Sequence, residues 1–131
     1  MALNTLLTYV PLYIKTSRES LKTLLENVDL LVSSDLEAKK KAEFEAYRMA
    51  HTLKSSSLFM DYKHISAMMV LLERYFSLVK DGGITISQAA IDSIHEVVKQ
   101  SEADLRSIER ENKEIDLANQ INTLKQLVSP T

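Results

Sequence analysis

The sequence predicts an all-α protein, an up-and-down antiparallel four-helix bundle with a short fifth helix at the C-terminal end. Only two glycines and two prolines occur among the 131 residues, which leaves few breaks for hairpins and favours long helices. Apolar residues recur at helical spacing in four long segments that are joined by short connections. Four amphipathic helices connected in this way close into an antiparallel bundle.

A chain of this length forms one domain, residues 1–131, and we place the bundle at about residues 9–111. The net charge of −2 gives no electrostatic reason to bind nucleic acid or an anionic membrane. Because there is no cysteine, disulfides and zinc–thiolate sites are excluded. No apolar run approaches the roughly 20 residues that span a bilayer, and no basic region precedes the N-terminal apolar residues. We therefore expect a cytoplasmic protein without a cofactor.

The first long helix is predicted from Leu12 to about Val32, after a short apolar stretch at residues 1–10. Pro11 suits the first turn of a helix better than its interior. One apolar side is predicted for this helix, comprising Leu12, Leu21, Leu24, Leu25, Val28, Leu31 and Val32. A capping box at Ser34–Glu37 then begins the second helix, which runs to about Met60.

The third helix begins after Asp61, whose side chain is expected to cap it. Its apolar side comprises Ile65, Met68, Met69, Leu72, Phe76 and Val79. The sequence Asp81–Gly83 ends this helix, because a glycine can adopt the left-handed conformation that follows a helix C-terminus.

The fourth helix opens with a second capping box, Thr85–Gln88. Its apolar side comprises Ala90, Ile91, Ile94, Val97, Val98, Leu105 and Ile108. A weaker stripe follows a charged segment and ends at Pro130; it comprises Leu117, Ile121, Leu124 and Val128. Residues 112–131 form either a short fifth helix packed on the bundle or the start of a linker, and we favour the helix.

The stretch 47–60, within the second helix, has two different sides. A buried stripe is predicted on one side and comprises Ala46, Met49, Ala50, Leu53, Ser56, Ser57 and Met60. His51 lies outside this stripe, with Lys54 and Ser55 one turn further along on its own side. An exposed histidine beside a cation and small residues suits a phosphoryl-accepting surface, although spacing alone favours an ordinary surface histidine.

A carboxylate partner for His51 follows from the register of the second and third helices. If these helices are antiparallel and turn near Tyr62, His51 lies eleven residues before the turn and Glu73 eleven residues after it. Both side chains are then about 15 Å from the turn, at the same height. A carboxylate that accepts a hydrogen bond from Nδ1–H leaves Nε2 with a free lone pair, as a nucleophilic histidine requires. Lys54 can then pair with phosphoryl oxygens.

These residues resemble a known pattern. The run AHTLKSSS resembles the phosphoacceptor signature of histidine phosphotransfer (HPt) domains, in which lysine follows the modified histidine by three residues. The flanks YRMAH and LLERYF resemble the corresponding runs of chemotaxis-type kinases of the CheA kind. The resemblance covers roughly residues 9–111, and it departs from the family at Ser55 and Met60, where glycine is frequent.

The resemblance implies site residues and partners. His51 would be phosphorylated, Glu73 would orient it, and Lys54 would supply charge to the phosphoryl group. The docking surface would comprise Tyr47, Arg48, Ser55 and Leu58, although core packing is an equal alternative for Tyr47 and Leu58. The partners would be an ATP-binding histidine kinase domain, which phosphorylates His51, and a response-regulator receiver domain, whose aspartate then takes the phosphoryl group.

The chain has no glycine-rich phosphate loop, so it is not an enzyme by itself. Two contexts stay open: the N-terminal domain of a CheA-like histidine kinase, which the flanks favour, or a freestanding phosphorelay protein. A helical interaction module without chemistry is a further alternative. A carboxylate-bridged metal site fails on ligand count, because the nearest match to its motif is Asp92-x-x-His95. We expect His64 and His95 to be structural or solvated.

Overall fold

The computed structural model describes residues 3–129, and within this range the chain is helical with no strand. The elements, in chain order, are α1 (Leu3–Thr8), α2 (Val10–Asp29), the 3₁₀ turn η1 (Leu30–Val32), α3 (Leu36–Phe59), α4 (Lys63–Lys80), α5 (Gln88–Glu111) and α6 (Ala118–Val128). The predicted end of the last helix at Pro130 lies outside the described residues. Within residues 3–129, no helix combines the length and apolar character needed to span a bilayer.

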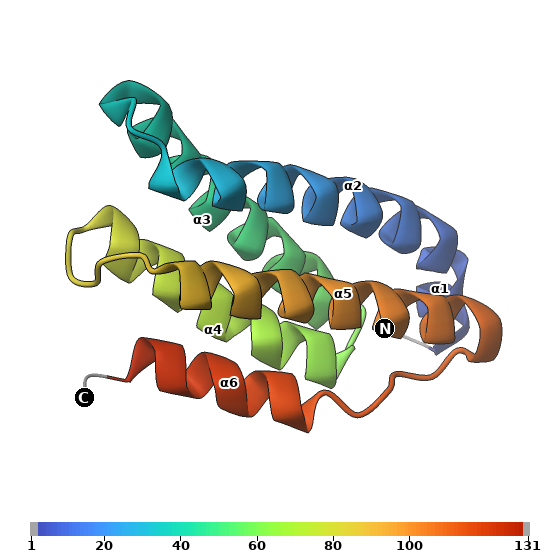
Figure 1. Ribbon diagram of the computed structural model, residues 1–131. Coiled ribbons are helices and arrows are strands. Elements are labelled where there is room, and N and C mark those ends of the chain that lie inside the picture. The colour runs from blue at the N-terminus through green and yellow to red at the C-terminus, as the bar shows by residue number, and fades with distance from the viewer. Residues whose placement is uncertain (1–2, 130–131) are drawn as a thin grey trace.

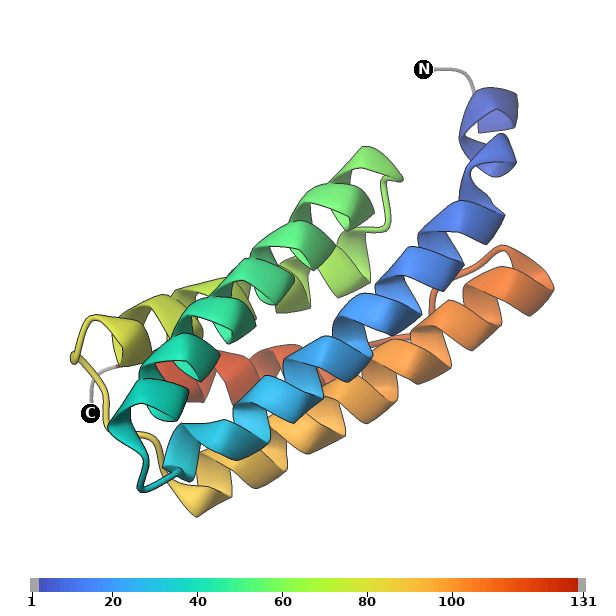
Figure 2. The same ribbon diagram turned by 90° about the horizontal axis from the view of Figure 1, so that it is seen from above.

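The four long helices α2–α5 form the predicted antiparallel bundle (Figure 1). Helix α3 packs against both α2 and α4, and α2 packs against α5. Helix α6 lies along α4 and also contacts α5, so the expected fifth helix is present and packs on the bundle. Helix α1 precedes α2 and extends past the turn between α3 and α4 (Figure 2). The all-α fold class predicted from the sequence is confirmed.

The buried side of α2 differs from the predicted stripe at both of its ends. The residues that are buried in α2 and η1 are Tyr13, Ile14, Ser17, Leu21, Leu24, Val28 and Leu31. Leu12 is exposed because alternating steps of three and four residues back from Leu21 lead to Ser17 and Ile14. Val32 is exposed because the α-helix ends at Asp29 and the 3₁₀ turn rotates the side chains that follow.

Both predicted capping boxes are displaced along the chain. Helix α3 is capped by Asp35, not Ser34, and the Asp35 carboxylate accepts hydrogen bonds from the N–H groups of Glu37 and Ala38 at 3.1 and 3.4 Å. Helix α5 is capped by Ser87, not Thr85, and the Ser87 hydroxyl accepts from Ala90 N–H at 3.1 Å. In each case the capping residue has the extended backbone that a helix N-cap requires.

The expected N-cap of α4 at Asp61 is wrong. Asp61 has φ 62°, the left-handed conformation, and it closes α3 instead. Its N–H donates to Leu58 O at 3.1 Å, and Tyr62 N–H donates to Ser57 O at 3.0 Å. This pair of bonds is a Schellman motif, in which a residue just past the helix adopts left-handed backbone. Tyr62 is the N-cap of α4 and gives no side-chain cap.

The predicted end of α4 is confirmed. Gly82 has φ +80°, and the N–H groups of Gly82 and Gly83 donate to Val79 O and Leu78 O at 3.1 and 2.8 Å. These bonds repeat the Schellman motif that ends α3, with glycine in the left-handed position. The Schellman motif after α3 leaves only residues 60–62 between α3 and α4, and this short connection holds the two helices side by side.

Candidate phosphoacceptor site

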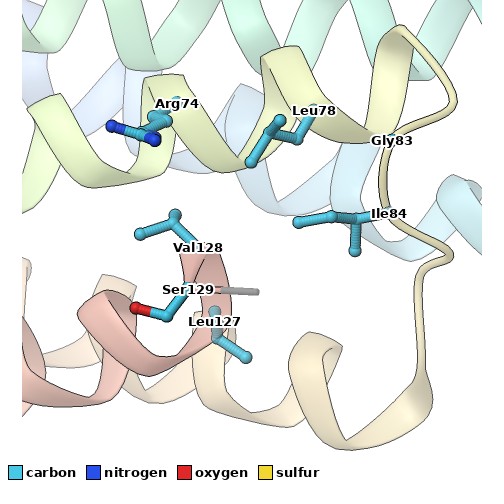
Figure 3. A pocket seen from close by; sticks show the side chains of 7 residues that line it. All are labelled: Arg74, Leu78, Gly83, Ile84, Leu127, Val128 and Ser129. Carbon is cyan, nitrogen blue, oxygen red and sulfur yellow. The ribbon is translucent and has the colours of Figure 1, made fainter. Parts of the chain in front are cut away.

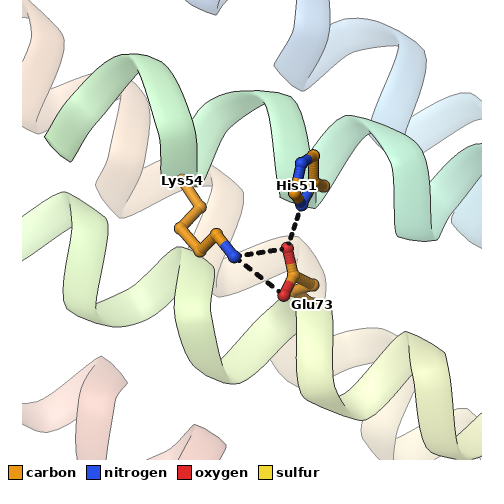
Figure 4. Close-up of polar contacts among 3 residues, drawn as sticks. All are labelled: His51, Lys54 and Glu73. Atoms are coloured by element: carbon orange, nitrogen blue, oxygen red, sulfur yellow. Dashed lines mark hydrogen bonds and ion pairs between the residues drawn. The ribbon is translucent and has the colours of Figure 1, made fainter. Parts of the chain in front are cut away.

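The register of α3 against α4 brings His51 and Glu73 together. The imidazole Nδ1 lies 2.6 Å from Glu73 Oε2, although the residues are 22 positions apart in the chain. Figure 4 shows the imidazole of α3 directed at the carboxylate of α4. The contact predicted from equal distances to the turn is therefore present in the structure.

The local sequence of α3 turns His51 outward. The buried residues of α3 are Ala42, Ala46, Ala50, Leu53 and Ser57, which follow one another at three or four positions. His51 directly follows one of these, and 53% of its side chain is exposed. Because the imidazole stands at the edge of the α3–α4 interface, one ring nitrogen meets a carboxylate while the other side of the ring faces solvent.

Glu73 is the centre of a three-residue polar contact. The Lys54 ammonium lies 3.0 Å from Glu73 Oε1 and 2.9 Å from Oε2, so the carboxylate binds Lys54 through both oxygens and His51 through one. The side chains of Lys54 and Glu73 are only 22% and 20% exposed, which limits solvent screening of this pair. Burial raises the pKa of the Glu73 carboxyl, but hydrogen bonds from Lys54 and His51 outweigh it and hold this pKa below its ordinary value.

The 2.6 Å contact determines which nitrogen of a neutral His51 can react. A carboxylate only accepts hydrogen bonds, so Nδ1 carries the proton and donates it to Glu73. The lone pair is then on Nε2, at the opposite edge of the ring. The arrangement therefore presents an exposed nucleophilic nitrogen whose tautomer is held by a partly buried carboxylate.

Comparison with known proteins identifies the family. The family model of the Hpt domain matches residues 9–128, which is nearly the whole chain. The chain belongs to the Hpt domain family. Membership assigns it to histidine phosphotransfer in two-component signalling.

The chain is also similar to one part of a longer protein. The chain is 27% identical over 100 residues to a protein named chemotaxis protein CheA from Bacillus subtilis (strain 168), and the match covers 76% of this chain. It covers only 15% of that relative, which is therefore a much longer protein. No solved structure shows a significant match to the chain.

Tyr47 contacts the phosphoacceptor candidate from the preceding turn of α3. Its ring lies nearly parallel to the imidazole of His51, with an interplanar angle of 19° and 6.4 Å between the centroids. Lys80, at the end of α4, places its ammonium 5.5 Å from the centre of the Tyr47 ring. Sequence reasoning missed Lys80, although the register that pairs His51 with Glu73 places Lys80 opposite Phe44, within one turn of Tyr47. Tyr47 is half-buried and packs against the core.

The other three expected docking residues of the Hpt domain do not contact His51 in the same way. Arg48 is exposed and its guanidinium binds Glu45 Oε2 at 2.9 Å. Ser55 is exposed, Ser56 is half-buried and Ser57 is buried, so Ser55 is the most accessible of the three serines. Leu58 is 57% exposed, and core packing therefore does not account for it.

The remaining histidines have different surroundings. His64 Nδ1 lies 2.6 Å from the carbonyl oxygen of Ile115, in the α5–α6 connection. His95 Nε2 lies 2.7 Å from Asp29 Oδ1, between the exposed surfaces of α5 and α2. Among residues 3–129, no group of three or more histidine and acidic side chains is arranged to hold a metal ion.

The site is a surface and not a cavity. A groove of about 450 Å³ does occur elsewhere, between α4, the α4–α5 connection and α6. Figure 3 shows Leu78, Ile84 and Val128 around it, with Arg74 at one side. None of the residues that line this groove is His51, Lys54 or Glu73. An exposed acceptor on an open surface suits transfer between protein domains, because both a donor and an acceptor domain must reach the same atom.

Proposed function

We propose that His51 is the phosphoacceptor of this Hpt domain and that Nε2 is the atom phosphorylated. The observation that carries the proposal is the 2.6 Å contact between Nδ1 and Glu73 on an imidazole that is otherwise exposed. The contact commits the neutral ring to the tautomer with a free lone pair on Nε2. The family pattern around the histidine, AHTLKSSS, supports the same residue.

In the first step, the Nε2 lone pair attacks the γ-phosphorus of ATP bound to a separate kinase domain. The bond from phosphorus to the bridging oxygen breaks, and ADP leaves with that electron pair. Positive charge develops on the imidazole as the P–N bond forms, and the Glu73 carboxylate, already bonded to Nδ1–H, stabilises it. In the second step, an aspartate of a receiver domain attacks phosphorus, the P–N bond breaks, and neutral His51 is restored.

Lys54 supplies the positive charge nearest to the transferring group. Its ammonium has three donors, and both Glu73 oxygens are among its partners in the unphosphorylated protein. We propose that Lys54 keeps one Glu73 oxygen and turns a donor to a phosphoryl oxygen when the group arrives on Nε2. The ammonium group moves only a short distance in this exchange, because Lys54 lies one turn from His51 on the same side of α3.

The docking surface for the receiver is proposed to comprise Tyr47, Arg48, Ser55 and Leu58. Exposed Leu58 offers an apolar contact, Ser55 keeps the space beside the imidazole small, and Arg48 carries positive charge. Tyr47 is proposed to support the imidazole from behind through the parallel rings. By itself the chain is a phosphate carrier and not a catalyst, since both chemical steps use a partner domain.

The proposed context is the N-terminal phosphotransfer domain of a CheA-like kinase in the cytoplasm. The similarity to CheA supports it, because this match covers most of the chain but only 15% of the relative. The alternative is a freestanding phosphorelay protein. The coding sequence downstream of residue 131 distinguishes them: an ATP-binding kinase domain in the same reading frame supports the first, and a stop codon supports the second.

Labelling with a kinase domain and radioactive ATP tests the proposed acceptor. Wild type should gain one phosphoryl group that is labile to acid and stable to alkali, as a phosphoramidate is. His51→Gln should abolish labelling and leave the fold intact, because the side chain is outside the buried stripe. His95→Gln is the matched control, an exposed histidine that is also bonded to a carboxylate, and it should label normally. Persistent labelling in His51→Gln would contradict the proposal.

A further inference from the structure

A buried carboxyl group that phosphotransfer does not use lies between α5 and the connection from α5 to α6. Asp104 of α5 is 0% exposed. Its Oδ1 accepts a hydrogen bond of 2.7 Å from Ile115 N–H, in the connection between α5 and α6. Its Oδ2 is buried and receives no N–H or O–H donor. A buried oxygen without a donor is costly if the carboxyl is ionised, so the state of this group needs an explanation.

A second acid lies beside the Asp104 carboxyl group. Glu114, in the same connection, lies within hydrogen-bonding reach of the Asp104 side chain. The Glu114 oxygens already accept the N–H groups of His64 and Ile65, each at 3.0 Å. Glu114 therefore caps the N-terminus of α4, which has no capping side chain of its own. The His64 ring adds a contact of 2.6 Å from Nδ1 to Ile115 O.

Two carboxyl groups in hydrogen-bonding contact are compatible with one proton between them. A proton on Asp104 Oδ2 converts the unsatisfied oxygen into a donor toward Glu114 and removes the charge from the buried position. Burial is the main cause that raises the pKa of Asp104 to about 8, Glu114 raises it further, and the Ile115 N–H lowers it. The geometry and this pKa agree on a protonated Asp104 at neutral pH.

We propose that Asp104 and Glu114 share one proton and that this pair is a proton-operated latch, which fastens residues 112–128 to the bundle. The closed latch joins three elements: α5 through Asp104, the connection through Glu114, and the start of α4 through its backbone N–H groups. It also sets the position of α6, whose Leu124, together with Leu117 just before it, is buried against the bundle. The proposal goes beyond phosphotransfer, because it concerns attachment of the C-terminal segment.

In the part of the chain that the structure describes, the donors to the two carboxyl groups are backbone N–H groups, and no cationic side chain is paired with either acid. Tyr13 of α2 and Tyr62 before α4 face the two acids; burial is the main cause that raises the pKa of each phenol, and both acids raise them further. His64 faces the connection through the carbonyl of Ile115 and not through a carboxyl oxygen. Within residues 3–129, Glu114 is the charged side chain that acts on the pKa of Asp104, and it raises this pKa.

The latch makes opening of the segment depend on pH. When residues 112–128 detach, Asp104 becomes hydrated and its pKa returns to an ordinary value of about 4. Between this value and about 8, the closed form holds a proton that the open form has released. Opening therefore releases one proton, and the open fraction should rise by up to about tenfold per pH unit in this window. Above pH 8 the slope should disappear.

Hydrogen exchange of the full 131-residue chain between pH 6 and pH 8 tests the latch, after correction for the pH dependence of intrinsic exchange. Protection of α6 amides should fall by about tenfold per pH unit, while α2 and α3 keep theirs. Asp104→Asn should remove the slope, because the amide keeps both an acceptor for Ile115 N–H and a donor for Glu114 without a titrating proton. Glu111→Gln, an exposed acid at the end of α5, is the matched control and should keep it.

Each outcome decides the proposal. A flat α6 profile in wild type, or a slope that survives in Asp104→Asn, would overturn it. A slope shared equally by α2 and α3 would also overturn it, since the whole bundle and not the segment would then be opening. If Asp104→Asn does not fold, carboxyl carbon NMR of wild type replaces it: a midpoint for Asp104 near pH 8 supports the latch, and a midpoint near pH 4 refutes it. None of these measurements depends on phosphorylation of His51. The latch can therefore be refuted while the proposed function stands, and the reverse is also true.

Discussion

Replacing Glu73 separates the orienting role of the carboxylate from its charge. Glu73→Gln keeps an oxygen that can accept from Nδ1–H but loses the negative charge, and Glu73→Ala loses both. The contacts at stake are the 2.6 Å bond to His51 and the pair of contacts to Lys54 at 2.9 and 3.0 Å. We therefore expect the rate of phosphorylation to fall in the order wild type, Gln, Ala, with His51 still the only labelled residue.

The size of the effect follows from these contacts. A hydrogen bond to a charged group contributes about 1.5–3 kcal/mol, and each 1.4 kcal/mol of barrier is about a tenfold change in rate. Half of the His51 side chain is exposed, which weakens the interaction and places the effect toward the low end. We expect phosphorylation to slow by about 10-fold in Glu73→Gln and by up to about 100-fold in Glu73→Ala.

Two measurements check the reasoning. Single-turnover phosphorylation with a saturating kinase domain gives the rate, and ¹⁵N NMR of the imidazole gives the tautomer of neutral His51. In wild type the proton should reside on Nδ1, and in Glu73→Ala a mixture of both tautomers should appear. Glu19→Ala removes an exposed acid of α2 and should change neither quantity. If Glu73→Ala phosphorylates at the wild-type rate with an unchanged tautomer, the contact has no part in the reaction.

The same contact affects stability at acid pH. Since the pKa of Glu73 is lower in the folded protein than in the unfolded chain, the unfolded chain binds this proton first as pH falls. The stabilisation from Glu73 is thus complete above its ordinary pKa of about 4.5 and is lost as pH falls through the lower folded value. The difference in unfolding free energy between wild type and Glu73→Ala should therefore shrink as pH falls below about 4.5. A difference that stays constant as pH falls would contradict this expectation.

Three further changes test the docking surface, a helix end and the core. Ser55→Trp should slow transfer to the receiver and change the free energy of unfolding by less than about 1 kcal/mol, as for a surface residue; unchanged transfer would place docking elsewhere. Gly82→Ala should lower that free energy by about 1 kcal/mol, because a side chain at φ +80° is strained although the space is open. Gly83→Ala is its control in the same urea titration, and an equal loss in both would refute the conformational argument. Tyr13→Phe should cost about 1–2 kcal/mol by leaving the buried Ser57 hydroxyl without its 2.8 Å partner, and a further Ser57→Ala change should recover part of it; simple additivity in a double-mutant cycle would exclude that coupling.

The sequence by itself determined the helices and the contact at the site. The apolar positions of α4 from Ile65 to Val79 follow helical spacing, which depends only on neighbours within one helix. Gly82 marks the end of α4 because few other residues adopt its backbone conformation. The pairing of His51 with Glu73 could be counted from the turn because two antiparallel helices advance at the same rise per residue.

Only the tertiary structure decided how the ends of the helices are satisfied and what surrounds the site. The cap of α4 comes from Glu114, which contacts Ile65 across 49 positions of the chain, so no local pattern around Asp61 could show it. The contact of Lys80 with the Tyr47 ring likewise joins the end of α4 to the middle of α3. Helical spacing is repeated within a few residues and can be read locally, whereas capping and charge pairing between distant segments depend on the path that the whole chain takes.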